Sequence, residues 1–397
     1  MRNMTHHTSE RGAVSLFIVV FTVLLLTIVT VSFVRIMLAD QEQATTTDLS
    51  QSAYDSAQSG VEDAKRALLR YQTECSTGDA ARCAAAAIAP VATQQCNEAL
   101  SQVIGSNVAG EEVIVQQDAG DENLQQAYTC VKISLQTDDV VGSLKSDDTK
   151  LIPLISTAAF NTVQIEWFSG KNVSSTTSTN KPVNLQLPGT TPLLRKTTGT
   201  GAWPSNRPSI IRAQFMQVAA GGFTLSDIEN NVGQNSYSLF LYPIGTTGTA
   251  RNPNTPGIMS VTARDSRKTP VGTPDSVTCS GNIGSGGYAC RVQLVLPNTV
   301  PAASRSAFLR LGSLYNTSEV RVSLLDSASP STLIQFDNVQ PLIDSTGRAG
   351  DIFRRVQSRV EFTDFPYPDA AVDLTGNFCK NFSVTDTPSD FVNNCTP

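Results

Sequence analysis

Histidine is nearly absent from this sequence of 397 residues, which holds only His6 and His7. Beyond residue 7, a Ser-His-Asp or Cys-His catalytic site cannot form, and the imidazole ligands that zinc usually takes are missing. Charged residues are also sparse, at 16%, and the net charge of -6 gives no basic footprint. These gaps exclude histidine-dependent catalysis and predict no nucleic-acid partner. We therefore expect a protein that is not an enzyme.

The usual signatures of cofactor and metal sites are missing as well. Glycines gather within residues 281–287, but no Lys-Ser/Thr ending of a phosphate-binding loop follows them. No two cysteines have the CxxC spacing of a zinc site. The acidic residues within 118–122 and at 138–139 do not match a calcium-binding EF-hand and are interpreted as solvated loops. The sequence predicts no cofactor and no metal, and the one enzyme class left open is a hydrolase that uses acids alone.

Cysteines are frequent enough for a disulfide framework. All eight follow the hydrophobic N-terminal segment, at Cys75, Cys83, Cys96, Cys130, Cys279, Cys290, Cys379 and Cys395. An even number placed in this way suits disulfides in an oxidising compartment. Spacing alone does not determine the pairing, but Cys279 with Cys290 and Cys379 with Cys395 would each close a short loop. We expect these two local pairs.

One long hydrophobic run lies near the N-terminus. Residues 13–34 contain no charge, Pro or Gly, and at about 1.5 Å per residue they span roughly 33 Å, the thickness of a bilayer's hydrocarbon core. Arg2 and Arg11 precede the run, while the charges after it are mixed in sign, which favours a cytoplasmic N-terminus. The rival interpretation is a cleaved signal peptide, for which the run is too long. We expect a single-pass protein of the cell membrane with an exported C-terminal region.

The helix is expected to continue beyond the membrane over residues 35–72. This stretch has no proline and one glycine, and Tyr54, Val61 and Leu68 repeat every seventh residue. Small side chains form a narrow face on which another backbone can approach closely, namely Ala53, Ala57, Gly60 and Ala64. Two partners for this face remain open, the chain's own sheet and another subunit.

The start of the chain resembles a known export signal. Glu10-Arg11-Gly12, followed at once by the apolar stretch from Ala13 to Phe17, is similar to the class III signal of type IV pilins. The resemblance implies a leader at residues 1–12, cleavage of the Gly12-Ala13 bond by a prepilin peptidase, and methylation of the new terminal amine. Residues 52–64 further resemble the alanine-rich, acidic helix of PilX-type minor pilins. The resemblance covers about the first 72 residues.

One position departs from the major pilins of that family. They carry a Glu five residues into the mature chain, where it pairs with a neighbouring subunit's amine in the membrane, and this sequence has Phe17 there. A carboxylate in lipid is energetically unfavourable unless it is paired. Phe17 has no carboxylate, so this subunit cannot offer that pairing. Tip-initiating pseudopilins share the lack.

The resemblance therefore implies a minor, low-copy or tip subunit of a type IV pilus or pseudopilus-like filament. Its role would be in assembly, adhesion or surface interaction. The implied partners are the membrane, other pilin-like subunits, the prepilin peptidase and a surface ligand. The alternative is a single-pass surface protein that binds an external ligand without assembling.

The exported remainder shows the alternation of half-buried strands. Apolar and polar residues alternate at 162–167, 290–296, 320–324 and 352–362, with no long helical pattern between them. The predicted fold class is α+β, with the long N-terminal transmembrane and amphipathic helix packed on an antiparallel β-sheet head that is loop-rich and disulfide-stabilised. Trp167, Trp203 and Tyr288 are candidates to line a ligand site, although Trp167 fits the inward face of its strand.

Composition divides this head into three parts. Residues 73–168 hold the first four cysteines and an alanine run at 84–87, which we expect to form a short helix held by Cys83 and Cys96. Residues 169–208 are rich in Ser, Thr, Gly and Pro and are predicted to be a linker or loop, as is the stretch 245–274. Residues 209–397 form the β-rich C-terminal part.

Overall fold

A computed structural model describes residues 11–76, 80–85, 112–115, 126–146, 148–173, 181–185, 203–217, 235–245, 257–266, 274–284, 286–328 and 331–361. The chain divides into two compact units. Unit 1 comprises Met1–Ile133 with Ile343–Ser358, and unit 2 comprises Ser134–Leu342 with Arg359–Pro397. Each unit thus combines stretches that lie far apart in the sequence.

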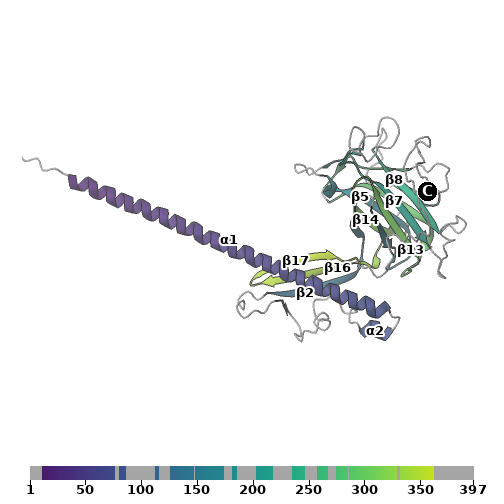
Figure 1. Ribbon diagram of the computed structural model, residues 1–397, viewed down its shortest axis with the longest axis horizontal. Helices are drawn as coiled ribbons and strands as arrows, with labels where there is room; N and C mark the ends of the chain where they lie inside the picture. Colours follow the sequence, from purple (N-terminus) through teal and green to yellow (C-terminus); the bar gives the residue numbers. More distant parts are fainter. Residues whose placement is uncertain are drawn as a thin grey trace, which may run out of the picture. The chain divides into compact units, whose positions relative to one another are not determined.

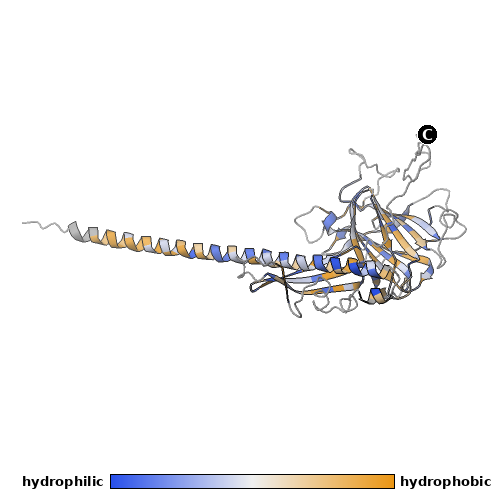
Figure 2. Ribbon diagram, turned by 60° about the horizontal axis from the view of Figure 1, so that its bottom comes forward, coloured by the Kyte–Doolittle hydropathy of each residue, from blue (hydrophilic) through white to orange (hydrophobic). Residues whose placement is uncertain are grey.

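Unit 1 is built on one unbroken helix, α1 (Arg11–Ser76). No proline interrupts these residues. Residues 16–48 are exposed, and burial then recurs at the helical spacing from Ala53 to Gln72. Figure 2 shows the corresponding change along α1 from hydrophobic to hydrophilic residues. The helix ends at Ser76, a few residues beyond the end expected from the sequence.

Unit 1 also contains β1 and parts of β2, β16 and β17, which form a four-stranded sheet in the order β1-β2-β16-β17. Figure 1 labels the last three of these strands. The strands of this sheet are β1 (Val113–Ile114), β2 (Ala127–Thr137), β16 (Phe336–Ala349) and β17 (Ile352–Arg359). Gly350, with φ of 55°, lies in the two-residue turn between β16 and β17, and a glycine adopts this left-handed conformation without steric cost. The sheet provides the surface on which the second half of α1 lies.

Unit 2 contains two larger sheets. A five-stranded sheet has the order β10 (Asp275–Thr278), β8 (Ser236–Ile244), β7 (Ile210–Gln217), β13 (Ala307–Leu314) and β4 (Thr149–Pro153). The other runs β15 (Leu333–Ile334), β14 (Ser318–Leu325), β5 (Phe160–Ser169), β12 (Tyr288–Val300) and β9 (Gly257–Ser260), and β3 (Val140–Leu144) also pairs with β14. A small sheet joins β6 (Lys181–Pro182) to β11 (Asn282–Ile283).

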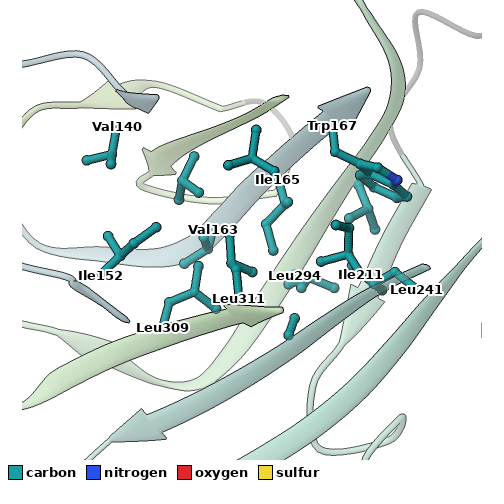
Figure 3. Close-up of a cluster of buried hydrophobic side chains, with 14 of the residues drawn as sticks. Val140, Ile152, Val163, Ile165, Trp167, Ile211, Leu241, Leu294, Leu309 and Leu311 are labelled. Atoms are coloured by element: carbon teal, nitrogen blue, oxygen red, sulfur yellow. The ribbon is translucent and has the colours of Figure 1, made fainter. Parts of the chain in front are cut away.

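The core of unit 2 lies between these two sheets. Val163, Ile165 and Trp167 of β5 are fully buried, as the alternation in the sequence predicts. They join one hydrophobic cluster with residues of the other sheet, including Ile211 and Leu309. Figure 3 shows these side chains meeting between strands of both sheets. Unit 2 is therefore a sandwich of two layers.

The head thus differs from the predicted antiparallel sheet. It holds several sheets, and two strand pairs are parallel, β10 with β8 and β12 with β9. The expected loops also contain structure, because residues 169–208 supply the 3-10 helix η1 (Gly170–Asn172) and β6, and 245–274 supply β9. Strands from both sides of 169–208 build unit 2, so no boundary between compact units falls there. The elements η1, β6 and β9 are too short to show a periodic pattern of apolar residues in the sequence.

The disulfides agree with the expectation at one pair and differ at another. Cys279 is bonded to Cys290, the local pair predicted from spacing. Cys83 is bonded to Cys75 and not to Cys96, because α1 continues through Cys75 and brings it beside the helix α2 (Ala80–Ala85). Cys130 is disulfide-bonded as well. The expected helix at 84–87 begins earlier, at Ala80, and Cys96, Cys379 and Cys395 lie outside the described residues.

Candidate functional site

The N-terminal half of α1 carries an unusual amount of exposed apolar surface. An 18-residue window within it has a mean hydropathy of 2.8 and none of it is buried, so the helix is long and apolar enough to cross a membrane. Phe17, the position where the sequence departs from major pilins, is 73% exposed. Gly12 and Ala13, the two residues of the expected cleavage bond, lie in the first turn of the same helix.

Within residues 16–34, the hydroxyl side chains are satisfied by the helix itself. Thr22 donates to the carbonyl of Ile18 at 2.7 Å, and Thr30 to that of Leu26 at 2.5 Å. Thr27 and Ser32 bond to their own helix in the same way. Hydroxyl groups bonded like this need no water, so they do not oppose transfer of the helix into lipid.

The small-residue face of α1 packs against the chain's own sheet. Ala53, Ala57 and Ala64 are fully buried, and Gly60 is buried with them. A Cβ atom at Gly60 would come within 2.5 Å of Ser345 Oγ and 2.9 Å of Val131 Cγ2. Of the two partners that the sequence left open for this face, the structure places the chain's own strands β2 and β16 on it.

Gly347 of β16 makes the closest approach to the helix. A Cβ atom added there would overlap the backbone oxygen of Ala53 and the backbone nitrogen and Cα of Ala57. These atoms belong to the helix backbone and cannot move aside as a flexible side chain can. The contact therefore requires small residues on both elements, and sequence reasoning found only the helical side of it.

Polar contacts define the position of the helix along the sheet. The hydroxyl of Tyr128 on β2 donates to Asp63 at 2.8 Å, and the side chain of Arg354 on β17 donates to Ser50 at 2.8 Å. Burial, followed by the hydrogen bond to Asp63 and its charge, raises the pKa of Tyr128, so the phenol stays protonated and remains a donor. Each contact joins residues far apart in the sequence.

Between the apolar half and this docked half, α1 has a polar exposed segment. Every residue from 39 to 48 is exposed, and the hydroxyls of Thr45, Thr46 and Thr47 each bond to the helix carbonyl four residues earlier. At about 1.5 Å per residue the segment is roughly 15 Å long. No other described part of the chain covers this segment.

The carboxylates singled out from the sequence at 138–139 are engaged inside unit 2. Asp138 accepts a hydrogen bond from Gln335, and Asp139 pairs with Arg359 at 2.7 Å. Among the described residues no group of three His, Cys, Asp or Glu side chains is placed to hold a metal ion. The acidic cluster at 118–122 lies outside the described residues.

A buried ion triad on the six-stranded sheet was not found from the sequence. Glu166 is 1% exposed and bonds Arg291 at 2.6 Å and Arg321 at 2.5 Å. The three residues lie directly opposite each other on β5, β12 and β14. Only the strand register reveals this arrangement, because in the sequence the three charges are unremarkable members of alternating strands.

The three aromatic candidates have separate surroundings. Trp167 is fully buried and donates to the carbonyl of Ser209 at 3.0 Å, which makes it a core residue. Trp203 stacks on Tyr315 with ring centres 4.5 Å apart. Tyr288 has the guanidinium of Arg321 4.9 Å from its ring centre and lies at the edge of a surface cavity.

No family model matches this chain, and no curated protein and no solved structure shows a significant similarity to it. Among the described residues, α1 combines an exposed apolar half with a half that packs on a sheet.

Proposed function

We propose that this chain is a minor subunit of a type IV pilus or pseudopilus-like filament, anchored in the membrane by α1 with its β-rich part exported. The observation that carries the proposal is one continuous helix, Arg11–Ser76, with two different halves. In the first half, residues 16–34 expose only apolar side chains and internally bonded hydroxyls. The second half is fixed to a sheet through a buried small-residue face.

Cleavage at the Gly12-Ala13 bond gives this helix its role in assembly. Removal of residues 1–12 leaves the apolar segment in place, so export and anchorage are compatible. The bond lies in the first turn of α1, and a peptidase must bind it in an extended form. Gly12 favours that local unwinding, because glycine is a poor helix former.

Phe17 favours a low-copy or tip subunit over a repeating shaft subunit. A phenyl ring is compatible with lipid but cannot neutralise a neighbouring subunit's terminal amine as a carboxylate does. A repeating shaft subunit would need that neutralisation at every step. The chain therefore fits a low-copy or tip position, where the exposed polar segment at residues 39–48 is free to contact neighbouring helices.

The proposal predicts a specific N-terminus. When the full chain is co-expressed with a prepilin peptidase, mass spectrometry of the membrane fraction should find a mature protein that begins at methylated Ala13. Gly12→Val should block processing, because a branched side chain hinders the extended approach of the scissile bond. Phe17→Ala serves as the matched control and should be processed as the wild type is.

Two outcomes would contradict this prediction. An intact Met1 terminus in the presence of an active peptidase would show that the chain has no class III signal, and a terminus after residue 34 would indicate an ordinary cleaved signal peptide.

The second candidate function is a single-pass surface protein that binds an external ligand without assembling. It is favoured by the exposed residues 16–38 alone. It predicts no processing at Gly12 and no recovery of the chain in sheared filaments.

A further inference from the structure

A surface cavity of about 510 Å³ lies at one end of the six-stranded sheet of unit 2. Its size falls in the range of small-ligand sites, about 300–1,000 Å³. The lining comes from the end of β5 with η1, the start of β12, the loop before it, β6 and β14. None of these lining residues belongs to α1 or to the sheet that supports the proposed function.

The first wall of the cavity is formed by a strained strand end. Phe168 has φ of 65°, which is unusual for a bulky residue, and it is fully buried directly after the buried Trp167. This conformation places two consecutive aromatic rings in the core and turns the chain from Ser169 into η1. Ser169, Gly170 and Lys171 thereby reach the cavity.

Hydrogen bonds hold this wall in place. The side chain of Asn172 accepts from the backbone nitrogens of Ser169 at 2.9 Å and Glu319 at 3.1 Å, which ties η1 to β14. The ammonium of Lys181 donates to the carbonyls of Gly170 at 2.5 Å and Val173 at 3.1 Å. A wall fixed before binding loses little entropy when a ligand arrives.

A second part of the lining comes from the glycine-rich residues 283–284 and 286–288, which lie between two cysteines joined by a disulfide. The Cys279–Cys290 bond joins the two ends of the loop, and Ile283 within it is buried and pairs with Lys181. Gly286, with φ of 73°, makes the turn that leads to Tyr288. The loop therefore presents backbone polar groups beside one aromatic ring.

Two charges of opposite sign line the cavity and are available to a ligand. Neither Lys171 nor Glu319 forms an ion pair within the described part of the chain, whereas Lys181 already serves the backbone. Lys171 offers a cation to an anionic group, and Glu319 offers an acceptor to hydroxyl donors. A bare anion such as phosphate could pair with the lysines, but it would be repelled by Glu319 and would offer that carboxylate no hydroxyl donors.

We propose that this cavity binds a carboxylated sugar of the uronic acid class. Its carboxylate pairs with Lys171, its hydroxyls donate to Glu319, and its ring lies against Tyr288 and the glycine loop. Each of the three parts of such a ligand then meets a group of matching chemistry. A neutral sugar lacks the anion, and a simple anion lacks the hydroxyl donors.

The test uses the full chain in detergent micelles and isothermal titration calorimetry with glucuronic acid. We expect saturable binding of glucuronic acid, and binding of glucose and of inorganic phosphate that is at least about tenfold weaker. Lys171→Gln and Glu319→Gln should each weaken glucuronic acid binding by about tenfold or more. Lys145→Gln removes an exposed lysine outside the cavity and is the matched control.

Three results would overturn the proposal. The first is no saturable binding of glucuronic acid to the folded wild type, and the second is equal binding of glucose or phosphate. The third is unchanged affinity in Lys171→Gln and Glu319→Gln while circular dichroism shows both variants folded. Because the cavity lining shares no residue with α1, failure here is distinct from failure of processing at Gly12.

Discussion

At the scale of single residues, the contact between Gly347 and the α1 backbone imposes the strictest requirement in unit 1. A side chain at Gly347 would push the strand away from the helix, because the atoms it meets are backbone atoms of Ala53 and Ala57. The burial of Ala53 and Ala57 follows from this close approach. These alanines favour helix formation, and they also form the surface on which the helix packs against the sheet.

Gly347→Ala should therefore destabilise unit 1 by about 3 kcal/mol through overpacking. Hydrogen exchange measured by mass spectrometry should show faster exchange in β2 and in the buried part of α1. Gly257→Ala is the matched control, because Gly257 is also in a strand and a Cβ atom added there would meet no atom within 4 Å. Its exchange should change little, and unchanged protection in Gly347→Ala would contradict the described packing.

At the scale of elements, the helix and the sheet are joined by a hydrogen bond with a defined pH dependence. The pKa of Tyr128 is raised in the folded protein, mainly by burial and then by Asp63. The folded state keeps the phenol proton at a pH where the unfolded chain has lost it. The stabilisation is therefore complete below about pH 10, the ordinary tyrosine pKa, and declines as the pH rises further.

Urea unfolding followed by circular dichroism at pH 8 and pH 10.5 tests this dependence. The wild type should lose on the order of 1 kcal/mol more than Tyr128→Phe between the two pH values. At pH 8 the variant should be less stable by about 1 kcal/mol, because Asp63 loses its donor. Parallel alkaline losses in both proteins would show that Tyr128 does not carry the effect.

Elements also show how far the sequence alone could predict the fold. The inward faces of β5, β12 and β14 followed from local alternation, since Val163, Val292 and Val322 are all fully buried as expected. Strand order did not follow, because pairing joins segments more than 100 residues apart, as between β4 and β13. The Cys75–Cys83 pair was missed because it depends on the last turn of α1.

The small-residue face of α1 and the cavity of unit 2 could each be predicted only in part, because both depend on contacts between segments that are distant in the sequence. The small-residue face of α1 was visible as a helical pattern, but its partner Gly347 was not, since nothing local marks a glycine that faces a helix backbone. The cavity charges Lys171 and Glu319 come from η1 and β14 and meet only through strand register. Chemistry that depends on register cannot be read from spacing in one segment.

At the scale of the whole molecule, the proposed anchorage rests on α1 alone. Most residues from 16 to 38 are apolar and exposed, and no other described part of the chain covers them. In water, apolar surface of this extent is strongly unfavourable, and a bilayer or neighbouring apolar helices relieve it. Under this proposal, the two compact units are held near the membrane by α1.

The double variant Leu24→Arg/Leu25→Arg tests this anchorage directly. Each arginine near the centre of the span opposes insertion by about 2.5–3.5 kcal/mol, so the variant should pass from the carbonate-resistant membrane pellet to the extractable fraction. Thr45→Arg lies in the exposed polar segment of the same helix and should stay in the pellet with the wild type. Extraction of the wild type by carbonate, or full retention of the double variant, would show that α1 is not the anchor. The filament proposal would then fail as well, because a subunit whose helix does not enter the membrane has no route to the assembly site.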